Sequence, residues 1–246
     1  MALISFIIPA RNEEALLGAT IDAIRTAAGA VQAEFEIIVV NDASTDATAA
    51  IAAARGATVV TVELRKISAV RNAGAKVARG EVLYFVDADT LIDATVLAAT
   101  AEALKRGAVG GGARVACDAQ TPRLARWFVS GFSFLWFGMN WAAGCFVFAR
   151  REAFGAVGGF DERYYATEEM HFSRALKTQG RFVIVRPAVV TSGRKARMYS
   201  IGQLCRMTLR FMLFRGIRGY QKKEGLDFWY DDRREKRTTQ HEQSSL

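Results

Sequence analysis

Val82-Leu83-Tyr84-Phe85-Val86-Asp87-Ala88-Asp89 is the stretch that decides the fold. Five consecutive apolar residues are typical of a strand that is buried on both faces, and the acidic residues that follow end it abruptly. Three other short apolar runs also end in polar loops, at residues 3–8, 36–40 and 58–62. Together the four runs predict buried, parallel strands.

Ala-rich segments with a helical pattern lie between these runs, at residues 14–27, 46–55 and 69–78. Asn12 or Glu13 is expected to open the first helix, and Ser44 with Thr45 to cap the second. Alternating strands and helices predict a doubly wound α/β sheet, in which ligands bind beyond the carboxyl ends of the strands. The loops at those ends cover residues 9–14, 41–46, 63–66 and 87–90.

Composition places the chain among globular proteins. Its 246 residues are 51% hydrophobic and 24% charged, which suits one large domain. The net charge of +8 suits a nucleotide-sugar, an acidic membrane or nucleic acid, or else only aids solubility. Three scattered cysteines without C-x-x-C spacing imply neither disulfides nor a zinc site, and the first residues do not resemble a signal peptide. We therefore expect a cytoplasmic protein.

Asp87 and Asp89 form the first candidate site. Two carboxylates at the end of a buried strand suit a hard divalent cation, Mn²⁺ or Mg²⁺, which could neutralise a departing diphosphate. The alternative is a solvated turn in which Asp89 or Asp93 caps the next helix. Asp42 follows the second run, at a position where an acidic group can accept hydrogen bonds from a base or ribose. The alternative there is an Asx-turn that caps the helix at Thr45.

The second half of the chain is less regular. Residues 144–149 and 182–185 are expected to be strands, and residues 168–177 and 200–214 helices. Residues 127–149 carry no formal charge, and about 20 apolar residues can span a bilayer. Glycine and polar residues interrupt that segment, and a span would place Glu168 and Glu169 on the opposite side from the acidic loops. A buried aromatic helix followed by a core strand is therefore expected.

Four ordered motifs resemble those of the family 2 glycosyltransferases, which have the GT-A fold. The matching residues are 8–14, 39–46, 69–74 and 78–81 together with 87–90. The resemblance implies a doubly wound, mostly parallel sheet flanked by helices, with a C-terminal helical extension. It also implies a GT-A domain over residues 1–220, with a nucleotide-binding half at 1–115 and an acceptor half at 116–220, before a polar tail at 221–246.

The resemblance also assigns roles on the donor side. It implies that Asp42 contacts the nucleobase of a nucleotide-diphosphate sugar. It implies that the loop of Asp87, Ala88 and Asp89 handles ribose, diphosphate and metal. The residues implied to line the nucleotide pocket are Pro9, Ala10, Arg11 and Glu13. Arg71 either touches the donor or ties its helix to the sheet.

On the acceptor side the resemblance implies that Glu169 is the general base, with Glu168 as a substitute. An acidic helix N-terminus is the alternative for this pair. Cationic Arg194 and Lys195 could pair with the diphosphate. The Q-x-x-R-W motif of processive synthases is absent, because Leu204, Cys205 and Arg206 follow Gln203, which favours transfer of a single sugar.

These features predict an inverting, metal-dependent glycosyltransferase with an unidentified acceptor. Residues 204–223 resemble a basic amphipathic helix, which could lie on the anionic inner face of a membrane if the acceptor is lipid-linked. The alternative is a helix that packs on the domain with its arginines in solvent. The alternatives are a polyprenyl-phosphate sugar synthase and a non-catalytic nucleotide-sugar binding protein. No nucleic-acid-binding motif is recognisable, so nucleic acid is not an expected partner.

Overall fold

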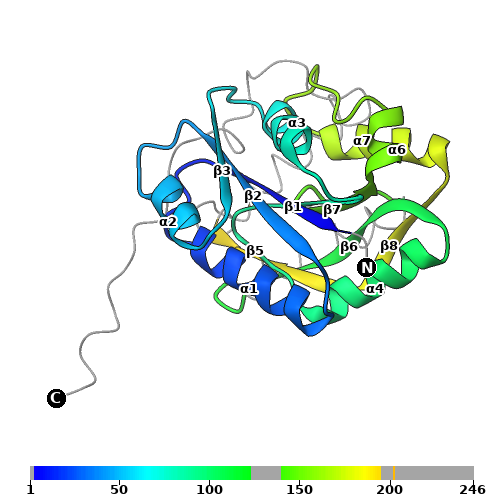
Figure 1. Cartoon of the computed structure of the whole chain (residues 1–246), viewed down its shortest axis with the longest axis horizontal. Helices are drawn as coiled ribbons and strands as arrows, with labels where there is room; N and C mark the ends of the chain where they lie inside the picture. The colour runs from blue at the N-terminus through cyan, green and yellow to red at the C-terminus, as the bar shows by residue number, and fades with distance from the viewer. Residues whose placement is uncertain (1–2, 123–139, 195–201, 203–246) are drawn as a thin grey trace.

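A mixed eight-stranded sheet forms the centre of the protein (Figure 1). The structure is a computed structural model that describes residues 3–122, 140–194 and 202. In chain order the elements are β1 (Ile4–Ala10), α1 (Leu17–Ala30), β2 (Phe35–Asp42), α2 (Thr48–Ala54), β3 (Thr58–Val62), α3 (Ile67–Val77), β4 (Val82–Val86), β5 (Thr90–Leu91), α4 (Ala94–Lys105), β6 (Ala108–Cys117), β7 (Phe146–Arg150), α6 (Arg151–Ala156), α7 (Glu168–Gln179) and β8 (Arg181–Thr191).

The strands are ordered β3-β2-β1-β4-β7-β6-β8-β5 across the sheet. The first four are parallel, as are β6 and β8. Strand β7 runs antiparallel between β4 and β6, and the short β5 runs antiparallel to β8. The predicted fold, a mostly parallel sheet flanked by helices, is confirmed. The expected boundary between the two halves, at residue 115, falls inside β6, so both halves share one sheet.

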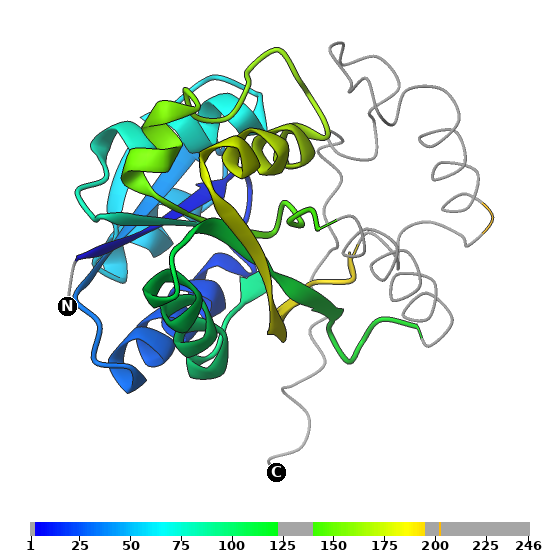
Figure 2. The same ribbon diagram turned by 90° about the vertical axis from the view of Figure 1, so that its right-hand side faces the viewer.

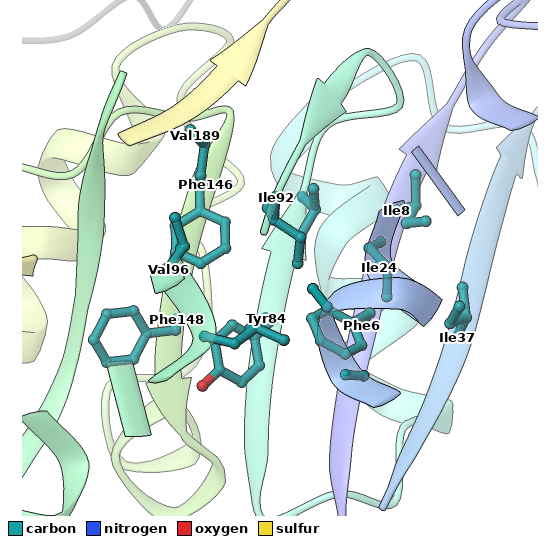
Figure 3. Close-up of a cluster of buried hydrophobic side chains, with 14 of the residues drawn as sticks. Phe6, Ile8, Ile24, Ile37, Tyr84, Ile92, Val96, Phe146, Phe148 and Val189 are labelled. Atoms are coloured by element: carbon teal, nitrogen blue, oxygen red, sulfur yellow. The ribbon is translucent and has the colours of Figure 1, made fainter. Parts of the chain in front are cut away.

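Each face of the sheet has its own hydrophobic core, because successive side chains of a strand point to opposite faces. Phe6 and Tyr84 lie in the cluster covered by α1 and α4, whereas Ile7 and Phe85 lie in the cluster covered by α3, α6 and α7. Figure 2 shows these two helical layers with the strands between them. In Figure 3 the ring of Tyr84 lies between those of Phe6 and Phe148, with centroids 5.2 and 5.9 Å away.

The expectation of full burial holds for three of the four predicted strands and is wrong for β3. Strands β1, β2 and β4 are largely buried, but every residue of β3 is at least partly exposed. The physical reason is position, since β3 is the edge strand and has a neighbour on one side only. An apolar, β-branched run therefore did not distinguish an edge strand from a central one.

The side-chain caps expected for α1 and α2 are wrong, whereas Asp93, one of the two residues considered as a cap for the following helix, does cap α4. Helix α1 starts at Leu17 and α2 at Thr48, and neither has a side-chain cap from its N-cap residue. Asn12 and Ser44 instead hydrogen-bond the neighbouring loop. Their capping groups are thus used to join two loops, which local sequence patterns do not reveal.

The second half follows its prediction where the structure describes it. Strand β7 and helix α7 correspond to the predicted strand at 144–149 and helix at 168–177, and β8 extends the strand predicted at 182–185. Residues 127–139, and most of the helix predicted at 200–214, lie outside the described residues. Among the helices of the described part, none is long and apolar enough to cross a membrane.

Strand β6 was not predicted, because Gly110, Gly111 and Gly112 weaken a strand pattern. The structure explains these glycines by close strand approach. A Cβ atom on Gly111 would overlap the carbonyl oxygen of Val183 on β8 and meet the ring of Phe148 at 2.8 Å. Strand β6 can approach β7 and β8 this closely only because residue 111 has no side chain.

We expect Gly111→Ala to destabilise the protein by about 1–3 kcal/mol or more, because the new methyl group must push backbone apart. Gly29→Ala is the matched control, since a methyl group added to this exposed residue of α1 would meet no atom within 4 Å. That change should be neutral or stabilising by about 0.5–1 kcal/mol. Urea unfolding measures both, and equal stabilities would contradict the packing described for β6.

Candidate active site

The carboxyl ends of β1, β2 and β4 meet at one edge of the sheet, as the sequence predicts. Pro9 and Ala10 end β1 and pair in register with Val40 and Asn41 of β2. Both Pro9 and Ala10 are buried, so they form the floor of this edge, and the half-buried Arg11 leads out of it. The predicted pocket residues of the first loop therefore lie beside those of the second.

Hydrogen bonds tie the loop after β1 to the loop after β2. The backbone N–H of Asn12 donates to Ser44 Oγ at 3.0 Å, and Asn12 Oδ1 accepts from the backbone N–H of Thr45 at 2.8 Å. The backbone N–H of Glu13 donates to Thr48 Oγ1 at 2.8 Å. Because these bonds join backbone to side chains across the two loops, the loops are held as one unit.

Asp42 organises the third loop. Its carboxylate is 6% exposed and accepts hydrogen bonds from the backbone N–H groups of Leu64 and Arg65, at 2.7 and 2.9 Å. The turn expected near Asp42 is made by its neighbour, since Asn41 Oδ1 accepts from Ser44 N at 3.3 Å. The contact between Asp42 and a nucleobase stays a prediction.

Backbone strain gathers at the same edge. Asn12, Ala43, Arg65 and Thr167 all have positive φ angles, between 50° and 69°, although none is glycine. Each of these conformations costs of order 1 kcal/mol and persists only where the surrounding structure imposes it. Three of these residues follow β1, β2 and β3, and Thr167 immediately precedes α7. Such clustering is typical of a functional site.

Arg71 of α3 joins three segments of the chain. Its side chain is 2% exposed, and Nη2 donates to Asp87 Oδ1 at 3.0 Å and to the carbonyl of Gly144 at 2.8 Å. Nη1 donates to Glu168 Oε1 at 2.7 Å. Burial alone would lower the pKa of Arg71, but the two carboxylates raise it above its usual value. These contacts tie α3 to the aspartate loop and to α7, and a contact between Arg71 and a donor stays a prediction.

Glu168 and Glu169 occupy different environments. Glu168 is 5% exposed and paired with Arg71, whereas Glu169 is half-buried with its carboxyl group near Gly144. Burial and the charge of Glu168 raise the pKa of Glu169 well above the usual 4.5, although Arg71 partly offsets this. A carboxylate with a raised pKa is the stronger base, so the geometry favours Glu169 for proton abstraction and Glu168 for structure.

Asp87 and Asp89 lie on a well-anchored loop. The N–H of Asp87 donates to the carbonyl of Cys145, and Thr20 Oγ1 of α1 donates to the carbonyl of Ala88 at 2.8 Å. The side chains of Asp87 and Asp89 remain 34% and 17% exposed. Among the described residues there is no group of three or more potential metal ligands. Magnesium-type ions are commonly held by one or two carboxylates plus substrate phosphates, so this pair fits such an ion.

Arg194 connects the first loop to the aspartate loop. Its two Nη atoms each donate to one carboxylate oxygen of Glu13 at 2.6 Å, and Nη2 lies 3.4 Å from Asp89 Oδ2. Burial would lower the pKa of Arg194, whereas Glu13 and Asp89 raise it. A cleft of about 1130 Å³ adjoins this cluster, and its walls include Asn12 and Thr191. The cleft is large enough for a small-molecule ligand.

Two parts of the site could not have been found from sequence. The carbonyl of Gly144 carries no side-chain signal. Glu13 and Arg194 are each expected at the site, but they are 181 positions apart, so their pairing has no local signal. Lys195 and the predicted basic helix lie outside the described residues.

Asp87 and Glu168, which come before and after residues 127–149 in the chain, bind the same guanidinium. The acidic groups on either side of that segment therefore lie on the same side of the molecule.

Comparisons with known proteins agree with this fold. The model of the family described as glycosyl transferase family 2 matches residues 5–160. No curated protein matches the chain in sequence.

Solved structures add three similar folds. TarS 1–349 from S. aureus is 18% identical, with a TM-score of 0.59 over 79% of this chain and 61% of that one. The mannosyltransferase PcManGT from Pyrobaculum calidifontis is 20% identical, with a TM-score of 0.60 over 84% of this chain and 64% of that one. Mannosyl-3-phosphoglycerate synthase from Rubrobacter xylanophilus is 19% identical, with a TM-score of 0.61 over 86% and 72%. The chain thus spans about three fifths of TarS 1–349 and of PcManGT.

The two glutamates should respond oppositely to removal of charge. Folding raises the pKa of Glu169, so the native state binds its proton more tightly, and stability falls as pH rises from 4.5 through the folded pKa. Glu169→Gln should therefore be more stable than wild type at pH 8, by a margin that disappears below pH 4.5. Glu168→Gln leaves Arg71 short of a partner and should cost about 3 kcal/mol.

Denaturant unfolding of both variants between pH 4 and pH 9 measures these differences. A Glu169→Gln variant that is less stable than wild type at pH 8 would contradict the pKa assigned to Glu169. Equal losses in both variants would contradict the separate roles of the two residues.

Proposed function

Because the chain belongs to glycosyl transferase family 2, we propose that it moves one sugar from a nucleotide-diphosphate sugar to an acceptor hydroxyl, with inversion at the sugar carbon and dependence on Mn²⁺ or Mg²⁺. The observation that carries the proposal is the shared guanidinium of Arg71. It brings the donor-side Asp87 and the acceptor-side Glu168 together, although they come from different halves of the chain. A displacement needs the leaving group and the base close to one carbon, and this pairing brings the loop that would hold the leaving group next to the helix that carries Glu169.

The donor class is supported by proteins of similar fold. TarS 1–349 has a structure in complex with UDP-GlcNAc, and PcManGT has one in complex with GDP-Man and Mn²⁺. We propose that Asp42 recognises the base here, beside Pro9, Ala10 and Arg11. A carboxylate has capacity for about four hydrogen bonds, so the N–H groups that Asp42 already accepts leave room for a base.

The diphosphate end of the donor would meet the two aspartates. Asp87 and Asp89 would hold the ion, which when bound supplies Lewis-acid stabilisation of the departing diphosphate. Arg194 and Lys195 would pair with phosphate oxygens, because a guanidinium or ammonium beside phosphate makes strong charge-assisted hydrogen bonds. The hydrogen bond from Arg71 would fix the position of the Asp87 carboxylate.

Glu169 would take the proton from the acceptor hydroxyl. The acceptor oxygen then attacks the sugar carbon from the face opposite the diphosphate, and the bond to the diphosphate breaks. The Arg71–Glu168 pair would fix the first turn of α7 and therefore the position of Glu169. No covalent enzyme intermediate is needed for this single displacement.

The division of labour between the glutamates also bears on the non-catalytic alternative. A half-buried carboxyl group with a raised pKa beside an ion-paired neighbour is typical of active sites. This observation favours the enzyme. The lipid-linked acceptor and the inner face of a membrane rest on residues 204–223, which lie outside the described residues.

A binding experiment with a matched control tests the proposal. Thermal shifts with UDP-, GDP- and dTDP-sugars, each with and without Mn²⁺, should find one donor that stabilises wild type by about 2.7 kcal/mol at one hundred times its dissociation constant. Asp89→Ala should lose the Mn²⁺-dependent part of that gain. Asp93→Asn is the control, because it removes a nearby carboxylate while an Asn can still cap α4.

Donor hydrolysis or transfer, followed by NMR of the product, checks the stereochemistry. The anomeric configuration of the product should be opposite to that of the donor, and Glu169→Gln should lower the turnover number by about a hundredfold or more. Retention of configuration, or full metal-dependent binding by Asp89→Ala, would contradict the proposal.

A further inference from the structure

Arg194 and a metal ion would use the same carboxylate. Nη2 of Arg194 lies 3.4 Å from Asp89 Oδ2, and Thr191 Oγ1 lies 3.5 Å from Asp89 Oδ1. A divalent ion on Asp89 would therefore meet a guanidinium at about the distance of an ion pair. Like charges at such a distance repel strongly when water is largely excluded.

Burial makes this competition effective. The side chains of Arg194, Asp89 and Glu13 are 14%, 17% and 9% exposed, so bulk water screens their charges only weakly. An exposed arginine would simply turn away when a cation arrived. Arg194 is instead held by a forked pair of 2.6 Å hydrogen bonds to Glu13.

The backbone around Arg194 keeps this arrangement in register with the aspartate loop. Ser192 N donates to the carbonyl of Asp89 at 3.1 Å, and Gly193 N donates to Asp118 Oδ2 at 3.1 Å. The chain just before Arg194 is thus fixed to the same loop that carries Asp89. Only the arginine side chain has to move for its charge to leave Asp89.

We propose that Glu13 and Arg194 form a cation latch, which keeps a free metal ion off Asp89 until a diphosphate draws the guanidinium away. This inference rests on the proposed function and deepens it, because it makes binding of metal and of nucleotide diphosphate mutually dependent. Glu13, predicted from the sequence to line the nucleotide pocket, is in this view a positioning residue that aims Arg194. A diphosphate offers Arg194 two or more phosphate oxygens in exchange for Asp89.

The latch makes a specific prediction about metal binding without nucleotide. Arg194→Gln should bind Mn²⁺ alone at least about tenfold more tightly than wild type, because the competing charge is gone. Arg194→Lys keeps the charge and should bind Mn²⁺ as weakly as wild type. Titrations followed by the EPR signal of free Mn²⁺ measure all three dissociation constants independently of activity.

Arg194→Gln leaves the buried Glu13 without its partner and could destabilise the fold, so a second variant serves as a control. The Glu13→Gln/Arg194→Gln double variant replaces both charged groups by neutral amides and should also bind Mn²⁺ more tightly than wild type. Equal Mn²⁺ affinity in wild type and in this double variant would overturn the latch.

Adding UDP, GDP or dTDP to the same samples separates the two proposals. With the matching nucleotide, wild type should gain Mn²⁺ affinity by about tenfold or more, whereas Arg194→Gln should gain less. Tight Mn²⁺ binding by wild type without nucleotide would overturn the latch and leave the proposed function standing. Failure of wild type to bind Mn²⁺ with any nucleotide would count against the proposed metal-dependent function itself.

Discussion

A buried guanidinium must be neutralised and hydrogen-bonded, and the two terminal nitrogens of Arg71 find their partners in three distant segments. Asp87 follows β4, Gly144 precedes β7, and Glu168 starts α7. Leaving such a charge unpaired would destabilise the folded state by several kcal/mol. Each of the three segments is therefore held in contact with Arg71. The same contacts place the loop of Asp87 and Asp89 next to the first turn of α7, which carries Glu169. Structural stability and the geometry of the site therefore depend on one side chain.

The direction of the parallel strands determines where the other residues of the site lie. Parallel strands deliver their carboxyl ends to one edge, and the loops that follow them carry the polar residues. Bonds such as those from Asn12 and Asp42 then join these loops to one another. Two arginines balance the carboxylates gathered there: Arg71 behind the aspartates and Arg194 beside the cleft. Charge compensation thus recurs on both sides of the aspartate loop.

Local patterns predicted much of this arrangement, because strand periodicity and loop polarity are local properties. The four parallel strands and the positions of Asp42, Asp87 and Asp89 at their ends follow from them. What the sequence could not supply are relations between distant residues. The caps expected from Asn12 and Ser44 serve a neighbouring loop, and Arg194 pairs with a residue 181 positions away. Likewise only the fold assigns Glu168 to Arg71 and leaves Glu169 as the group with the raised pKa.

The most direct test of the shared role of Arg71 is a double-mutant cycle on its two carboxylate partners. The free energy of unfolding would be measured for Asp87→Asn, Glu168→Gln and the combined variant. Each single change leaves Arg71 one of these carboxylates, whereas the combined change leaves the buried guanidinium without either of them. We expect the double loss to exceed the sum of the single losses by about 1 kcal/mol or more. Additivity to within about 0.3 kcal/mol would show that Arg71 does not couple the two sides of the site.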